Sequence, residues 1–279
     1  MSHQARKRFG QNFLHDANVI SRIVQSISPK ESDNIVEIGP GQGAITLELL
    51  KGTGQMHAVE LDRDLIQPLY DAASGIGELT IHSVDALRFD FSTLATPDSP
   101  LRVVGNLPYN ISTPILFHLL SQLQVIHDMH FMLQKEVVDR MAADPGSKTY
   151  GRLSIMLQAR CRVIPLFDIG PGAFRPAPKV HSSFVRLVPL ETPFDITDFA
   201  IFEKVVARAF SQRRKTLHNS LKGIIDQKGF ELTGIDPSLR AERLSVLNFI
   251  HLAEHAIAEE PQQSQPRHSK NYGSDNAEK

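Results

Sequence analysis

Short apolar runs alternate with amphipathic stretches through the first half of the chain. Such runs are typical of buried strands, and the stretches between them place apolar residues at the three- and four-residue spacing of helices. The expected strands lie at 34–39, 56–62, 79–86 and 101–109 and at the start of 128–142. Because strands here alternate with helices, the pattern predicts an α/β fold with a parallel, doubly wound, Rossmann-like sheet.

Residues with special backbone preferences mark the ends of the expected helices. Asp16 is expected to cap the helix at 17–27, and Gly52 is expected to close the second helix. Thr113 is placed to cap the helix after the fourth strand, with Pro114 as its first helical residue.

The pattern changes after residue 160. Two β-rich segments, 161–170 and 182–190, are joined by a link that is rich in Pro and Gly. We expect these segments to add an antiparallel hairpin to the edge of the sheet.

From residue 199 the spacing becomes helical, so the sequence predicts three parts. The first domain spans 1–198, a small helical domain spans 199–258, and a polar tail spans 259–279. A segment with so few apolar residues cannot bury a core, and we therefore expect the tail to be disordered.

Composition narrows the class of protein. The 279 residues are 41% hydrophobic, and the single cysteine, Cys161, excludes an internal disulfide and a multi-cysteine metal site. No histidine has a second His or Cys at metal-ligand spacing, so we expect no bound metal. We see neither an apolar signal core nor a window apolar enough for a membrane span, and we expect a cytoplasmic protein.

The overall net charge of −1 conceals an uneven distribution. Residues 31–100 carry 12 acidic and 3 basic side chains, whereas residues 146–223 carry 13 basic and 5 acidic ones. Residues 6–8 add three further cations. Such a molecule can bind a polyanion through one face, although two ordinary solvated surfaces would give the same count.

The first expected strand ends in a glycine-rich turn, EIGPGQG, with Gly39, Gly41 and Gly43. Glycine permits positive φ and lets a ligand approach the bare backbone. The second strand ends at Glu60, where a carboxylate can bind both hydroxyls of a ribose, and Asp85 after the third strand can meet an adenine amine. The alternative is that these acids are only surface residues.

These features suit any ligand that contains adenosine. NAD is one candidate, but the turn lacks the G-x-G-x-x-G spacing that seats a pyrophosphate, because position 44 is Ala. S-adenosylmethionine, a cofactor without phosphates and with a cationic sulfonium, fits the acidic strand ends better.

The fourth expected strand ends in GNLPY, residues 105–109. The Asn106 side-chain oxygen and the Leu107 carbonyl can accept both N–H bonds of an adenine amine, which frees its delocalised lone pair for attack. Pro108 stiffens the loop, and Tyr109 offers a flat face on which an extruded base stacks. The alternative is a strand-to-helix turn in which Tyr109 packs as part of the core.

Seven segments occur together in one order and carry a family resemblance. They are RKRFGQNFL (6–14), EIGPGQGAIT (37–46), VELDRDL (59–65), GNLPYNIST (105–113), MLQKEV (132–137), FRPAPKVHSSFVRL (174–187) and FSQRRKTLHNSL (210–221). Over about residues 5–258 the chain resembles the ribosomal RNA adenine dimethyltransferases, specifically the bacterial members that act on the small subunit.

The resemblance implies a reaction and a substrate. Two methyl groups would pass from S-adenosylmethionine to N6 of each of two adjacent adenosines, in the hairpin near the 3′ end of 16S rRNA. The substrate would be a nearly assembled small (30S) subunit and not free RNA.

The resemblance also assigns site residues by position. The implied cofactor contacts are Asn12, Leu14, Gly39, Gly41, Glu60, Asp85 and Asn106. Asn106 and Tyr109 correspond to the target-adenine pocket, and Phe174 corresponds to an aromatic residue facing the base from the other side. One departure is His181, where the family would be expected to carry an acid.

Arg213, Arg214 and Lys215 are expected to open a helix in the basic half and to contact RNA phosphates. A solvated helix face is the alternative for these three residues. For the whole chain, the alternatives are an RNA-binding assembly factor with secondary methylation and, less strongly, a dehydrogenase. We expect a monomer, since no long exposed apolar stripe is left unassigned.

Overall fold

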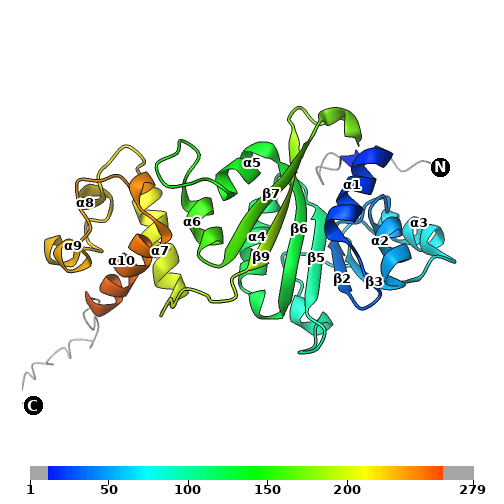
Figure 1. Cartoon of the computed structure of the whole chain (residues 1–279), viewed down its shortest axis with the longest axis horizontal. Helices are drawn as coiled ribbons and strands as arrows, with labels where there is room; N and C mark the ends of the chain where they lie inside the picture. The colour runs from blue at the N-terminus through cyan, green and yellow to red at the C-terminus, as the bar shows by residue number, and fades with distance from the viewer. Residues whose placement is uncertain (1–11, 260–279) are drawn as a thin grey trace, which may run out of the picture.

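A seven-stranded sheet forms the centre of the computed structural model, which describes residues 12–259. The strand order is β4-β3-β2-β5-β6-β9-β7 (Figure 1). The strands are β2 (Asn34–Ile38), β3 (Gln55–Val59), β4 (Glu78–His82), β5 (Leu101–Asn106), β6 (Ile126–Gln134), β7 (Cys161–Ile169) and β9 (Ser182–Pro189).

The sheet is mixed in the way that the pattern predicts. β4, β3, β2, β5 and β6 are mutually parallel, and β9 pairs antiparallel with both β6 and β7. From β2 the chain adds β3 and then β4 on one side, and it then returns to add β5 and β6 on the other side of β2. Ile38 at the end of β2 pairs with Gly105 of β5. The carboxyl ends of these two strands therefore meet at the point where the strand order reverses.

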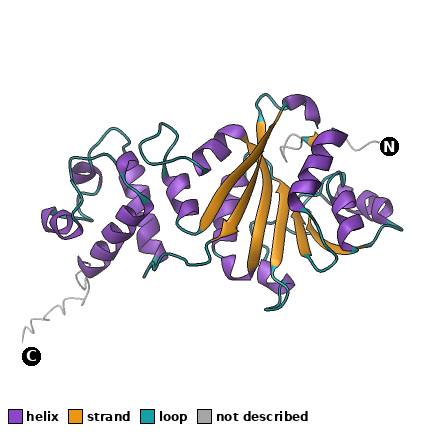
Figure 2. Ribbon diagram, in the orientation of Figure 1, coloured by secondary structure: helices purple, strands orange, loops and turns teal. Residues whose placement is uncertain are grey.

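Two layers of helices cover the sheet, as a doubly wound fold requires (Figure 2). The first layer buries apolar side chains of α1 (Ala17–Ile27), α2 (Thr46–Thr53) and α3 (Arg63–Ala73) against one face. The second layer packs α4 (Ser112–Leu120), α5 (Lys135–Met141) and α6 (Arg152–Gln158) against the other. Successive strand residues such as Ile35 and Val36 belong to opposite cores, which explains the continuous apolar runs.

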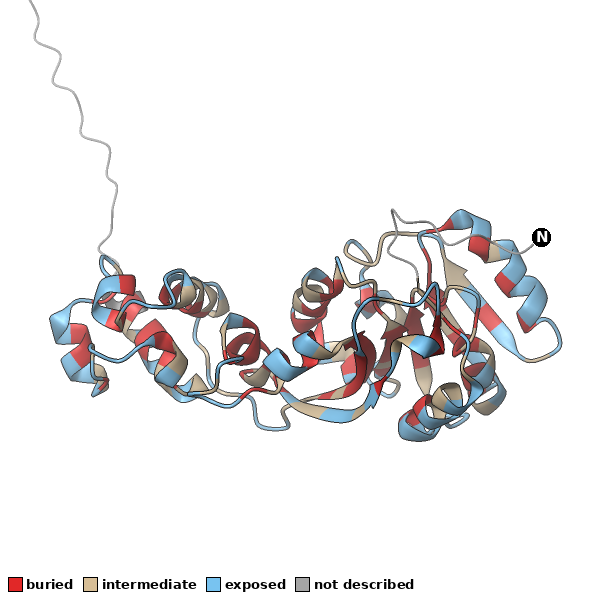
Figure 3. Ribbon diagram, turned by 90° about the horizontal axis from the view of Figure 1, so that it is seen from above, coloured by how far each residue is buried: buried red, intermediate tan, exposed pale blue. Residues whose placement is uncertain are grey.

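The C-terminal helices lie together at one end of the molecule (Figure 1). They are α7 (Phe199–Phe210), α8 (Leu217–Ser220), α9 (Gln227–Thr233) and α10 (Val246–Glu259). Their core also includes side chains of α6 and of the loop before it, and the Tyr150 hydroxyl donates a hydrogen bond of 2.9 Å to the Leu244 carbonyl. Figure 3 shows this buried cluster beside those of the sheet.

The helix ends confirm one local prediction and correct two. Asp16 caps α1 by accepting from the backbone N–H groups of Asn18 and Val19. α2 ends at Gly54 and not at Gly52, because Gly54 takes the left-handed conformation, with φ of 72°. α4 begins at Ser112 without a side-chain cap, so Pro114 is its third residue.

A two-stranded ribbon that the apolar pattern did not predict lies beside the main sheet. β1 (Phe13–Leu14) pairs antiparallel with β8 (Phe174–Arg175). Cys161 is buried in β7. Within residues 12–259 no helix combines the length and the hydropathy of a membrane-crossing segment. The expected polar tail and the cations at 6–8 lie outside the described residues, apart from Glu259 at the end of α10.

Candidate active site

A cleft of about 360 Å³ opens at the carboxyl ends of β2, β3 and β5. Its walls come from the turn after β2, the ends of β3 and β4, the loop after β5 and the segment around β1. The lining residues are 12–14, 37–42, 44–45, 59–61, 84–87, 106–111 and 115. Most of the sequence-predicted site residues therefore come together in one place.

The charge of the cleft is one-sided. Glu37, Glu60 and Asp85 line it, and within the described part of the chain no Lys, Arg or His side chain does. A pyrophosphate would face three carboxylates here without a counter-charge. A cationic ligand with hydroxyl and amine donors fits these three acceptors.

The glycine turn after β2 has the backbone that its sequence predicts. Gly39, Gly41 and Gly43 all have positive φ, at 68°, 58° and 83°. The Gly39 N–H donates to the Val59 carbonyl at 2.9 Å, which ties the turn to the end of β3. Side chains at these positions would strain the backbone, so the turn needs glycine to expose its peptide groups to the cleft.

Glu60 is held by the backbone around it. One carboxylate oxygen accepts from the Asp62 N–H at 2.7 Å, and the other accepts from the Gly41 N–H at 3.3 Å. Burial raises the pKa of Glu60, and these two bonds oppose that rise. Each oxygen keeps lone-pair capacity, so a fixed carboxylate is available for a pair of ribose hydroxyls.

Asp85 lies in the loop after β4 and is half-buried. Its Oδ1 accepts from the Leu87 N–H at 3.0 Å, which fixes the carboxylate at the cleft. Further acceptor capacity remains for an exocyclic amine.

Glu37 is a site residue that the sequence reasoning missed. It is 2% exposed and accepts a 2.6 Å hydrogen bond from the Thr46 hydroxyl. Burial raises its pKa to about 7, and the neighbouring Glu60 adds to the rise. A charged residue inside the apolar run 34–38 was the available signal, because a carboxylate in a buried strand needs a reason to be there.

Asn106 ends β5 with its amide oriented by the N-terminal segment. Its Nδ2 donates to the Asn12 carbonyl at 3.0 Å. Within residues 12–259 no donor contacts Asn106 Oδ1 or the Leu107 carbonyl, and both residues line the cleft. Two acceptors are thus left together, as attack by an amine requires.

The loop after Asn106 is fixed by its own backbone. The Leu107 N–H donates to the Met132 carbonyl at 3.2 Å, and the Pro108 carbonyl accepts from the Ile111 N–H at 3.1 Å. Tyr109 is half-buried at the cleft, and its hydroxyl lies 2.7 Å from Ser182 Oγ. Burial raises the pKa of Tyr109, so the phenol stays neutral at physiological pH.

The segment 12–14 closes one side of the cleft. A Cβ at Gly41 would lie 3.2 Å from the Phe13 ring, which shows how closely the ring covers the glycine turn. Leu14 pairs with Phe174 in the β1–β8 ribbon. Phe174 is 2% exposed and is not among the cleft-lining residues, so the structure does not bring it to the target pocket and its catalytic role stays a prediction.

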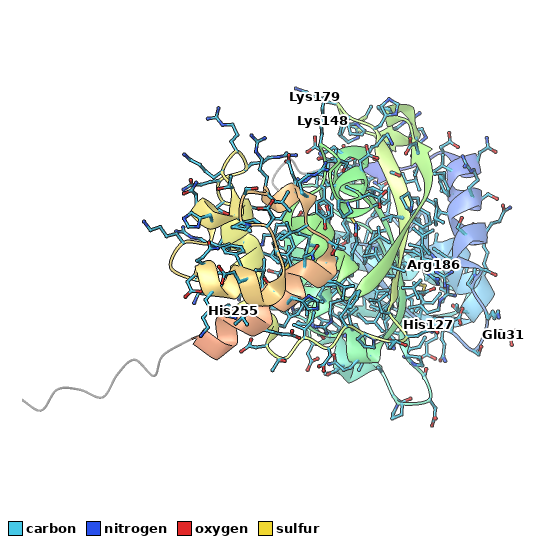
Figure 4. The ribbon with its side chains drawn as sticks, turned by 60° about the vertical axis from the view of Figure 1, so that its left-hand side comes forward. Glu31, His127, Lys148, Lys179, Arg186 and His255 are labelled. Atoms are coloured by element: carbon cyan, nitrogen blue, oxygen red, sulfur yellow. The ribbon has the colours of Figure 1, made fainter. Side chains whose placement is uncertain are left out.

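The three basic residues after α7 lie in a turn, not at the start of a helix as expected, because α8 begins only at Leu217. Arg213 pairs with Glu242 at 3.1 Å and donates to the Lys148 carbonyl, so it links this turn to two other segments. Arg214 and Lys215 are exposed. Lys148 and Lys179 both project from the upper edge of the view in Figure 4.

The family model and the most similar curated proteins point to the same family. The chain matches the ribosomal RNA adenine dimethylase family over residues 2–258. The ribosomal RNA small subunit methyltransferase A of Marinomonas sp. (strain MWYL1) is 55% identical over 259 residues, or 92% of this chain and 97% of the relative. The protein of that name from Hahella chejuensis (strain KCTC 2396) is 55% identical over 256 residues, or 91% and 94%.

Solved structures agree with this match. A dimethyladenosine transferase from Plasmodium falciparum has a TM-score of 0.73 and 26% identity, covering 86% of this chain and 95% of its own. The 23S rRNA methyltransferase ErmE has a TM-score of 0.69 and 23% identity, covering 88% and 100%, which supports the fold alone. The chain therefore belongs to the ribosomal RNA adenine dimethylase family that its motifs predicted, and it is an S-adenosylmethionine-dependent rRNA adenine dimethyltransferase.

Proposed function

We propose that this enzyme forms N6,N6-dimethyladenosine at two adjacent adenosines in the hairpin near the 3′ end of 16S rRNA. It acts in the cytoplasm, as a monomer, on a nearly assembled small subunit. The small-subunit names of relatives that are 55% identical support this substrate. The observation that carries the proposal is the position of Asn106 and Tyr109 beside a cleft lined by carboxylates.

The cleft would hold the methyl donor through the strand ends. S-adenosylmethionine supplies an electrophilic methyl group on a sulfonium when it is bound. Glu60 would accept from the ribose hydroxyls and Asp85 from the adenine amine, while Gly39 and Gly41 let the ligand lie on the backbone. Asn12 and Leu14 would cover it, and Glu37 adds a carboxylate that favours a cation.

The target amine would be held from two directions. Asn106 Oδ1 and the Leu107 carbonyl would accept its two N–H bonds, so the nitrogen lone pair is drawn out of conjugation with the ring. Pro108 stiffens this loop, and Tyr109 would stack on the flipped base. Methyl transfer then depends chiefly on proximity and orientation, and the positively charged product nitrogen loses its proton without a strong base.

RNA binding would use the basic segment, residues 146–223. Arg214 and Lys215 are exposed cations, and Arg213 fixes the turn that carries them. Each phosphate contact adds salt-dependent affinity without reading sequence.

A direct test uses tritiated S-adenosylmethionine and small subunits from a strain that lacks the modification. After incubation, the RNA is digested and the labelled nucleosides are identified and mapped. We expect N6,N6-dimethyladenosine at two neighbouring positions, and no label with Asn106→Ala. Label only at other positions of the 16S rRNA would refute the proposed substrate. Subunit binding without any label would favour the RNA-binding assembly factor instead.

A further inference from the structure

Tyr109 is fixed at both ends, by its backbone after β5 and by a hydrogen bond between its hydroxyl and a strand far along the chain. Its Cα follows β5, and its hydroxyl lies 2.7 Å from Ser182 Oγ, a residue 73 positions later in the chain. Ser182 is fully buried at the start of β9. Its backbone pairs with Gln134 of β6 and Ile169 of β7, so the hydroxyl partner is part of the rigid sheet.

This bond fixes the angle of the aromatic face. A phenol ring attached only through its Cβ can tilt and rotate about two side-chain torsions, whereas a hydroxyl anchored on a sheet residue removes most of that freedom. Ser182 does not line the cleft, so any effect that it has on a base must pass through Tyr109.

The two methyl transfers make different demands on the pocket. In each one, the N6 lone pair forms the new N–C bond, the electrons of the broken S–C bond stay on sulfur, and one N6 proton leaves to water. Adenosine enters with two N–H donors for Asn106 Oδ1 and the Leu107 carbonyl. N6-methyladenosine enters with one, so one acceptor is left unpaired and the base depends more on stacking.

We infer that Ser182 is a positioning residue that holds the Tyr109 ring for the target base and is needed more for the second methyl transfer than for the first. This inference rests on the proposed dimethylation of adenosine. Loss of the Ser182 hydroxyl should therefore leave an enzyme that still methylates adenosine but releases or accumulates N6-methyladenosine.

The adjacent serine provides a matched control. Ser183 is also buried in β9, but successive strand residues face opposite sides of a sheet. Its Oγ donates to the Phe167 carbonyl at 3.3 Å and does not contact Tyr109. Ser183→Ala removes the same atom from the same strand without touching the proposed link.

The experiment compares Ser182→Ala, Tyr109→Phe, the double variant and Ser183→Ala with the unaltered chain. Small subunits lacking the modification are methylated at saturating cofactor in time courses, and the ratio of N6-methyladenosine to N6,N6-dimethyladenosine is measured. We expect Ser182→Ala and Tyr109→Phe each to raise that ratio about fivefold, as expected for one lost neutral hydrogen bond. The double variant should match Tyr109→Phe, and Ser183→Ala should match the unaltered chain.

Each contrary result has one meaning. An unchanged ratio in Ser182→Ala, or additive effects of the two changes, would overturn the role of Ser182. An equal rise in Ser183→Ala would show a general effect of loosening β9. If Ser182→Ala does not fold, Tyr109→Phe alone tests the bond, and an unchanged ratio there also overturns the inference. If the unaltered chain makes no dimethyladenosine, the proposed function fails first.

Discussion

At the scale of single residues, Glu37 shows most clearly that the cleft is built for a charged ligand. A carboxyl group buried to this degree ordinarily pairs with a cation, and no cation lines the cleft within residues 12–259. Within residues 12–259 its carboxyl group accepts one hydrogen bond, and the donor is the neutral Thr46 hydroxyl. The residue therefore costs stability when it ionises without a cation beside it, and a cationic ligand would offset that cost.

The raised pKa of Glu37 makes a prediction about stability and pH. The group ionises at about 7 in the folded chain but near 4.5 when unfolded. Because the folded state binds the extra proton, the free energy of unfolding should fall as the pH rises from about 4.5 to 7. Glu37→Gln keeps an acceptor for Thr46 and should remove this loss, gaining roughly 3 kcal/mol over the unaltered chain at pH 8.

The measurement is urea unfolding of both proteins, without cofactor, at pH 5.5 and pH 8. The difference between the two free energies of unfolding should be roughly 1 kcal/mol at pH 5.5 and roughly 3 kcal/mol at pH 8. Parallel pH profiles for the two proteins would show that Glu37 does not carry the raised pKa.

At the scale of elements, the site depends on how closely β2 and β5 approach. A Cβ at Gly105 would lie 2.6 Å from the Ile38 carbonyl oxygen and 3.2 Å from Leu107 Cδ2. The first contact is with backbone and cannot relax by a side-chain rotation. Glycine at this position therefore lets the two strands that present Asn106 and the glycine turn lie side by side.

Gly105→Ala should push these strands apart and destabilise the fold by about 1–3 kcal/mol, the usual cost of overpacking. It should also weaken cofactor binding, because the strand ends carry the site. Unfolding midpoints and calorimetric titration with S-adenosylmethionine measure both effects. Gly170→Ala is the control, since a Cβ there meets nothing within 4 Å and φ is −73°. A Gly105→Ala protein as stable as this control would contradict the argument.

The apolar pattern was sufficient to predict the sheet and most of its neighbours. Short, mainly apolar runs such as 101–104, set between helical stretches, predict buried strands, and the motif at each strand end then places the cofactor acids and the Asn106 loop. The β1–β8 ribbon escaped prediction because strands of two residues have no period to detect. Its pairing depends on contacts between segments about 160 residues apart, which no local pattern contains.

Side-chain environments were predictable only where one motif supplies all the partners. The links of Asn106 to Asn12 and of Tyr109 to Ser182 join segments that meet only after folding. The position of Phe174 was inferred from resemblance, and the structure places its side chain in the core beside Leu14. The predicted cap of α4 was wrong because Ile111 takes the cap position, which makes Pro114 the third helical residue and not the first.

At the scale of the whole molecule, the acidic and the basic segments contribute to different parts of the proposed function. The acidic segment, residues 31–100, supplies the ends of β2, β3 and β4 at the cleft. The basic segment, residues 146–223, includes β7, β9 and the turn after α7. Within that turn, Arg213 pairs with Glu242 and donates to the loop before α6. Its charge is therefore already engaged, whereas Arg214 and Lys215 are exposed cations in the same turn.

This contrast predicts how RNA affinity responds to salt. Replacing Arg214 and Lys215 by Ala should weaken small-subunit binding. It should also make the negative slope of log affinity against log salt shallower by about two, one for each lost phosphate contact. Cofactor affinity and the unfolding midpoint should not change, because both side chains lie outside the cores. Filter binding across a range of KCl concentrations measures the slope.

The control replaces Lys51 and Arg63, two exposed cations of the acidic segment, and alters the net charge equally. If both double variants lower the slope alike, affinity reflects overall charge, and if neither does, the turn after α7 does not contact RNA.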